Sequence, residues 1–142
     1  MKAKDILERK GRQVLGVEAD DRLDDAIALL ANKNIGAVVV RRGDALAGIL
    51  SERDIVRALA GAPTGFRETK VEALMTTDLF TASPEASVDE LLDLMTERRV
   101  RHVPILEGET LSGILSIGDV VKHRIREVED EAKALKSYIS SS

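Results

Sequence analysis

Cysteine and tryptophan are absent from this sequence, and aromatic residues make up only 2% of its 142 residues. Without cysteine the chain can form no disulfide, no thiolate metal site and no cysteine nucleophile. Two histidines and one tyrosine leave little material for a histidine-ligated metal or a histidine-based catalytic triad. The apolar share is 44%, so we expect a core built from Val, Ile, Leu and Ala.

The chain also lacks a positive charge surplus and a long apolar run. Its 21 Lys and Arg against 25 Asp and Glu give a net charge of −4, which argues against nucleic-acid binding. The scarcity of aromatic residues for base stacking argues the same way. Apolar runs such as Ala37–Val40 are far shorter than the roughly 20 residues of a membrane helix. No apolar segment follows the first five residues, so no secretory signal is predicted and we expect a cytoplasmic protein.

The sequence repeats itself with a shift of 65 residues. Residues 35–57 align with 100–122 without a gap, and nine of these 23 positions are identical. The identical pairs are Val38/Val103, Gly43/Gly108, Leu46/Leu111, Gly48/Gly113, Ile49/Ile114, Leu50/Leu115, Ser51/Ser116, Asp54/Asp119 and Val56/Val121. The chain is therefore a tandem repeat of a unit of about 60 residues.

Both units have the same predicted order of helix, strand, strand and helix. The predicted helices span 21–33, 52–60, 87–99 and 117–137, and the predicted strands span 37–41, 46–50, 102–106 and 111–115. Ser87 to Glu90 match a reciprocal capping box. The segments 14–18 and 79–82 are candidates for a further strand, 61–65 is the clearest loop, and 70–75 is a short helical lead-in. A unit this small cannot bury its apolar faces alone, so we expect one pseudo-symmetric α/β (α+β) globule.

The motif Gly-Ile-Leu-Ser-x-x-Asp stands at a predicted strand–helix junction in each unit, at 48–54 and 113–119. A helix N-terminus offers unpaired N–H groups and a positive dipole end to a phosphate. A serine there can donate to phosphate or ribose, and a carboxylate three residues later can accept from the ribose diol. The same two residue types also form an ordinary helix cap, and the sequence leaves both interpretations open.

The duplicated motif, preceded each time by a hairpin, resembles the CBS domain pair, or Bateman module. The resemblance covers roughly 4–60 and 70–126, and 127–142 form a C-terminal helical extension. It implies two pseudo-symmetric CBS repeats, each a small sheet packed with two helices. The second copy is especially close to the family pattern, whereas the first has Val39 in place of the usual proline. It also has Gly36-Ala37 where the second copy has Arg101-His102.

The family resemblance further implies a sensor of adenine nucleotides or related adenosyl compounds. The ligand it implies is AMP or another adenine nucleotide, with ATP, ADP and NAD(H) as alternatives and no metal required. The candidate nucleotide-binding residues are Ser116, Gly118, Asp119, Arg101, His102, Pro104, Thr81, Ser51 and Asp54. In the family, a basic residue before the second copy's Pro-Val/Ile strand often contacts phosphate, a role that Arg101 and His102 match. Because Gly118 leaves room as well, we expect the cleft of Ser116 and Asp119 to bind AMP more tightly than that of Ser51 and Asp54.

Two further features lie in the predicted C-terminal helix. The basic run Lys122-His123-Arg124 is interpreted as solvated surface charge. An apolar heptad seam is formed by Val121, Ile125, Val128, Ala132, Leu135 and Ile139. The seam packs either on its own subunit or on a partner, and the helix is longer than a unit this small can cover. We therefore expect a homodimer, with residues 140–142 frayed.

The leading hypothesis is a stand-alone regulatory module that acts on an unidentified protein by changing shape or its dimer interface. The alternative is a ligand-independent dimerisation scaffold with vestigial nucleotide sites. Such pairs also occur within IMP dehydrogenase, but 142 residues cannot hold its catalytic barrel as well as both repeats. Since the required cysteine is absent too, we do not expect an enzyme.

Overall fold

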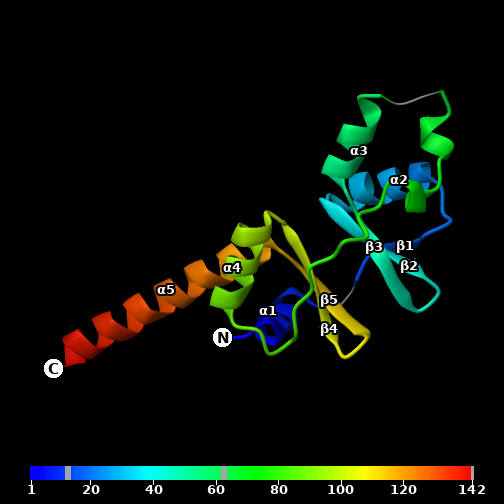
Figure 1. Cartoon of the computed structure of the whole chain (residues 1–142). Helices are drawn as coiled ribbons and strands as arrows, with labels where there is room; N and C mark the ends of the chain where they lie inside the picture. The colour runs from blue at the N-terminus through cyan, green and yellow to red at the C-terminus, as the bar shows by residue number, and fades with distance from the viewer. Residues whose placement is uncertain (12–13, 62–63, 142) are drawn as a thin grey trace.

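The structure is a computed structural model that describes residues 1–11, 14–61 and 64–141. The chain folds into two halves, and one long helix projects from the second half (Figure 1). In chain order the elements are α1 (Ala3–Lys10), β1 (Gly16–Glu18), α2 (Leu23–Lys33), β2 (Ala37–Arg42), β3 (Ala45–Ser51), α3 (Glu52–Leu59), η1 (Phe66–Glu68), η2 (Val71–Ala73), α4 (Val88–Arg98), β4 (His102–Glu107), β5 (Thr110–Ser116) and α5 (Ile117–Ser141). The mixed α/β fold that the sequence predicts is confirmed.

The two sheets share one hairpin design. In the first sheet β1 pairs parallel with β2, and β2 pairs antiparallel with β3. In the second sheet β4 and β5 form an antiparallel hairpin. Gly43 and Gly108 lie at the matching turns with φ of +66° and +64°, a left-handed conformation that strains any L side chain. This shared requirement explains why the repeat keeps glycine at both turns.

Several elements differ from their predicted bounds. The segment 79–82 contributes only an isolated parallel bridge of Ala82 with Ile105, where the first half has the strand β1. At α4, Ser87 accepts from the Glu90 N–H (3.1 Å), which is one half of the predicted capping box. Helix α5 continues through Ser141, so Ser140 and Ser141 are helical rather than frayed. Of the predicted loop 61–65, residues 62 and 63 lie outside the described residues, as does residue 142 of the predicted frayed end.

Each half has its own apolar cluster. The first contains Ala19, Leu23, Ala26, Leu30, Val38, Val40, Leu50, Ile55, Phe66 and Val71. The second contains Ala3, Ile6, Leu7, Ala86, Val88, Leu91, Met95, Val103, Ile105, Leu115 and Val120. Nearly all of these side chains are aliphatic, as the composition predicts.

The lead-in segments are exchanged between the halves. Helix α1, at the start of the chain, packs against β5 and α5 of the second half, whereas η1 packs on α2 of the first half (Figure 1). The backbone contacts match as well, because the Ala3 N–H donates to Ala86 O and the Val71 N–H to Asp21 O, both at 2.8 Å. This exchange ties the two halves into one pseudo-symmetric molecule.

Candidate functional site

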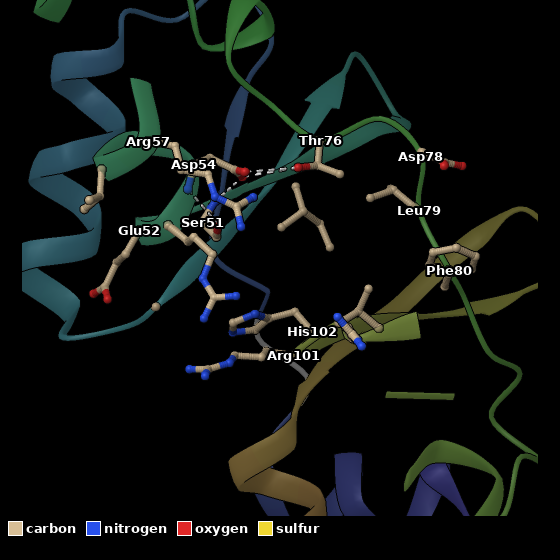
Figure 2. Close-up of a pocket in the computed structure, with 16 residues that line it drawn as sticks. Ser51, Glu52, Asp54, Arg57, Thr76, Asp78, Leu79, Phe80, Arg101 and His102 are labelled. Carbon is tan, nitrogen blue, oxygen red and sulfur yellow. Dashed lines mark hydrogen bonds between the residues drawn. The ribbon is translucent and has the colours of Figure 1, made fainter. Parts of the chain in front are cut away.

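A cleft of about 640 Å³ lies where the two halves meet. This volume is within the range of small-molecule sites, about 300–1,000 Å³. Residues from β3, α3, the 76–80 segment and the start of β4 line it. Figure 2 shows Ser51, Asp54 and Thr76 on one wall. Arg101 and His102 approach from the β4 side.

Ser51 and Asp54 lie at the N-terminus of α3 and cap each other. The Asp54 N–H donates to Ser51 Oγ (3.2 Å), and the Ser51 N–H donates to Asp54 Oδ2 (3.0 Å). The Thr76 hydroxyl also donates to the Asp54 carboxylate, at 3.2 and 3.3 Å from its two oxygens. A carboxylate has about four lone-pair sites, so Asp54 keeps acceptor capacity toward the cleft. Capping and ligand contact are therefore compatible here.

Positive charge in the cleft exceeds negative charge by one. The arginines that line it are Arg53, Arg57, Arg99 and Arg101, and the acidic residues are Glu52, Asp54 and Asp78. Among the described residues, none of the four guanidinium groups has an acidic partner within 4.0 Å. Unpaired guanidinium groups converging on a concave surface suit an anionic ligand, above all a phosphate.

The cleft also holds a partly buried histidine and an apolar wall. Burial, followed by the nearby charges of Lys10 and Arg101, lowers the pKa of His102 below its usual value of 6.5. A neutral imidazole can still donate one hydrogen bond and accept another. Leu79 and Phe80 lie on the facing segment and offer apolar surface to a planar ring system (Figure 2).

The predicted site residues do not all lie together. Ser51, Asp54, Arg101 and His102 line the cleft, whereas Ser116, Gly118 and Asp119 are not among its lining residues. The basic pair of one repeat thus meets the Ser-x-x-Asp motif of the other. The sequence hypothesis grouped Arg101 and His102 with the motif of their own copy. The backbone does place them beside that motif, since His102 pairs with Ser116 and the Ile117 N–H donates to Arg101 O (2.8 Å). They line the cleft as well, because the entry to β4 and the start of α3 face each other.

Two other predicted residues lie elsewhere. Pro104 is buried within β4, where it pairs with Ile114 and its carbonyl accepts from the Ala82 N–H (3.1 Å). Thr81 lines a separate hollow of about 410 Å³ beside α4. Neither side chain lines the cleft between the halves.

The second Ser-x-x-Asp motif is a capping box with an added ion pair. The Ser116 N–H donates to Asp119 Oδ2 (2.9 Å), and the Asp119 N–H donates to Ser116 Oγ (3.1 Å). Lys10 Nζ lies 2.7 Å from the same Oδ2. Partial burial opposes ionisation of Asp119, but the contacts from Lys10 and Ser116 outweigh it and lower the pKa below the usual 3.8.

The basic run in α5 is not uniformly solvated, which corrects the sequence interpretation. His123 is 3% exposed, with Nε2 3.1 Å from Glu127 Oε1. Arg124 pairs with Asp89, while Lys122 is exposed. The helical spacing turns the middle residue of the run inward, toward α4 and the second apolar cluster.

Sequence reasoning missed most of the other cleft residues, among them Arg53, Arg57, Arg99 and Thr76. Arg53 and Arg57 are one helical turn apart, directly after the Ser51 cap, so their spacing could have placed them on the motif's face. Thr76 and Arg99 belong to the linking segment and to the end of α4. No local pattern connects either of them to α3.

The described residues include neither a metal-binding cluster nor a membrane-spanning helix. No group of three or more His, Asp or Glu side chains among them could hold a metal ion. No helix in the described ranges combines the length and the apolar character that a membrane crossing requires.

The family model described as "CBS domain" matches residues 3–61 and 71–126. The chain therefore belongs to the CBS domain family. It is 37% identical over 144 residues to the mitochondrial CBS domain-containing protein CBSX3 of Arabidopsis thaliana, covering 95% of this chain and 70% of that protein. The CBS-domain containing protein ATU1752 of Agrobacterium tumefaciens superposes with a TM-score of 0.83 at 41% identity, covering 87% of this chain and 99% of that one.

A solved CBS domain pair with bound ligands has a similar fold. The pair of protein MJ0100, in complex with 5′-methylthioadenosine and S-adenosyl-L-methionine, gives a TM-score of 0.77 at 22% identity. It covers 89% of this chain and 98% of that one.

Proposed function

We propose that this chain is a regulatory module that binds an adenine nucleotide in the cleft between its halves. The observation that carries the proposal is that four arginines without an acidic partner among the described residues line the same cleft as Ser51 and Asp54 at the capped N-terminus of α3. The arginines are suited to phosphate, and Asp54 is suited to the two hydroxyls of a ribose. The apolar wall at Leu79 and Phe80 is suited to the base.

The ligand class follows from this chemistry together with the family. AMP is an adenine nucleotide that supplies a base, a diol and one phosphate, and ATP, ADP and NAD(H) add further phosphate. The pair of MJ0100 shares the fold, and both of its ligands contain adenosine, which makes adenosine compounds the first class to test. No bond making or breaking is assigned to the module, and it contains no cysteine nucleophile.

We also propose that the module acts as a homodimer on a separate regulated protein. The apolar seam of α5 faces solvent, with Val128, Leu135 and Ile139 exposed by 56–64%. On α3, Val56 and Leu59 are exposed as well. A second copy of the chain would cover such exposed apolar helical surfaces, and a bound nucleotide would bias the arrangement of the two halves.

Calorimetric titration of the full chain with AMP, ATP, NADH and S-adenosylmethionine tests the proposal. We expect heat of binding with the phosphorylated compounds and a weaker response to the cationic S-adenosylmethionine. An absence of binding for all four compounds would overturn the nucleotide role.

One observation favours a second candidate, a ligand-independent dimerisation scaffold. Both Ser-x-x-Asp motifs form complete capping boxes, so their presence needs no ligand to explain it. The scaffold predicts a dimer that forms equally well without nucleotide and shows no thermal shift with any of the four compounds.

A further inference from the structure

The two Ser-x-x-Asp motifs have the same cap but different third partners. In the first half the partner of Asp54 is the neutral hydroxyl of Thr76, at 3.2 Å. In the second half the partner of Asp119 is the ammonium group of Lys10, at 2.7 Å. Charge-assisted hydrogen bonds of this kind are shorter and about twice as strong as those between neutral groups.

Lys10 is held in this position by its helix. Its Nζ also donates to the Ile114 carbonyl (2.8 Å), so both contacts lie at the β5–α5 junction. Three residues earlier, Leu7 is 1% exposed and packs so closely on Gly113 that a Cβ there would meet Leu7 Cδ2 at 2.6 Å. Apolar packing of α1 therefore fixes the backbone from which Lys10 extends.

The β5–α5 junction of the second half also has fewer basic side chains than the cleft. In the 65-residue repeat, Arg53, Arg99 and Arg101 correspond to Gly118, Asn34 and Gly36. Three cations of the cleft thus have no counterpart near Ser116 and Asp119. Arg57 corresponds to Lys122, so only one of the four cleft cations keeps a basic counterpart. A nucleotide at this junction would have to displace Lys10 from Asp119 and would meet fewer cations than in the cleft.

We infer that Lys10 is a built-in occupant of the second nucleotide position, which limits the module to one nucleotide per chain at the Ser51–Asp54 cleft. The inference rests on the proposed function, because it assigns the ligand to one of two pseudo-equivalent motifs. It also reverses the order of affinity that the sequence alone predicts for the two motifs.

The test removes the ammonium group and counts binding sites. Adenosine is the probe, because it carries the diol without a phosphate and so does not need the missing arginines. Calorimetric titration of the full chain is expected to give about one adenosine per wild-type chain and about two per Lys10→Met chain. The double variant Lys10→Met with Asp119→Asn should return to one site. Lys4→Met, on the same helix but paired with Glu85, is the matched control and should stay at one.

The outcomes test the role of Lys10 and the proposed nucleotide-binding function separately. If wild type and Lys10→Met both bind one adenosine, or both bind two, the role of Lys10 is wrong while the proposed function stands. If wild type binds neither adenosine nor AMP but Lys10→Met binds adenosine, Lys10 is the occupant and the proposed cleft is wrong. If neither protein binds adenosine or AMP, both claims fail. Should Lys10→Met not fold, Lys10→Gln replaces it, because its amide can still donate to the Ile114 carbonyl.

Discussion

At the scale of single residues, the asymmetry between two matching aspartates has a direct consequence for binding. Asp54→Asn removes a charged acceptor from the proposed diol contact, which costs about 1.5–3 kcal/mol. By the factor of ten per ~1.4 kcal/mol, affinity for AMP should fall about 10- to 100-fold. Asp119→Asn is the matched control, because its carboxylate is bound to Lys10, and it should leave AMP affinity unchanged. Calorimetry on both variants measures this, and a loss confined to Asp119→Asn would reverse the assignment.

His102 gives the cleft a pH-dependent contribution to stability. Burial first, then Lys10 and Arg101, holds its pKa in the folded chain below 6.5, so the unfolded chain binds the proton more readily. The free energy of unfolding should therefore fall as pH drops below about 6.5, and the loss should end below the folded-state pKa. His102→Gln should remove this part of the loss. Urea titrations at pH 7.5 and 5.5 compare the two proteins, and equal losses in both would contradict the prediction.

At the scale of the elements, we expect the exposed end of α5 to stabilise the dimer rather than the fold of the monomer. All residues from Val128 to Ser141 are exposed, so truncation after Glu127 removes no buried side chain of that segment and keeps the partner of buried His123. Burial of a Leu or Ile in a dimer is worth about 1.5–3 kcal/mol. We therefore expect truncation to raise the dimer dissociation constant at least tenfold, in sedimentation at micromolar concentration, while the thermal unfolding midpoint of the monomer changes little.

Matched point variants on α5 sharpen that experiment. Leu135→Lys should weaken the dimer, whereas Lys136→Ala, one position away and outside the seam, should not. A full-length chain that sediments as a clean monomer would rule out the homodimer.

Elements with a strong local pattern could be predicted from the sequence, and those built by distant contacts could not. The hairpins and α2 to α5 follow from periodicity, caps and turn glycines within a short stretch. Helix α1 has only eight residues, most of them charged, and its apolar face is satisfied by β5 and α5 more than 100 residues away. The same holds for the site, since Ser51 and Asp54 come from a visible motif, whereas their pairing with Arg101 depends on how the halves meet.

At the scale of the whole molecule, the positive excess of one charge in the cleft predicts a small net repulsion when no ligand is bound. Arg53 and Arg57 come from the first half, and Arg99 and Arg101 from the second. Arg57→Gln should stabilise the ligand-free chain by a few tenths of a kcal/mol, the order expected for exposed charges. The same change should lower AMP affinity about tenfold, because it removes a phosphate partner.

Salt separates this effect from a general change in stability. In thermal unfolding, the gain from Arg57→Gln should disappear at 1 M salt, where charges are screened within about 3 Å. Arg126→Gln, on α5 and outside the cleft, is the control and should give no salt-dependent gain. A stabilisation by Arg57→Gln that persists at 1 M salt would contradict the repulsion.

The exchanged position of α1 bears on how the chain matures during synthesis. Ile6 and Leu7 leave the ribosome long before Leu115 and Val120, which belong to the same buried cluster. Domains usually fold in order as they emerge. Here α1 has no place to pack until the second repeat has been made. A nascent chain stalled between α1 and β5 would still expose the apolar face of α1.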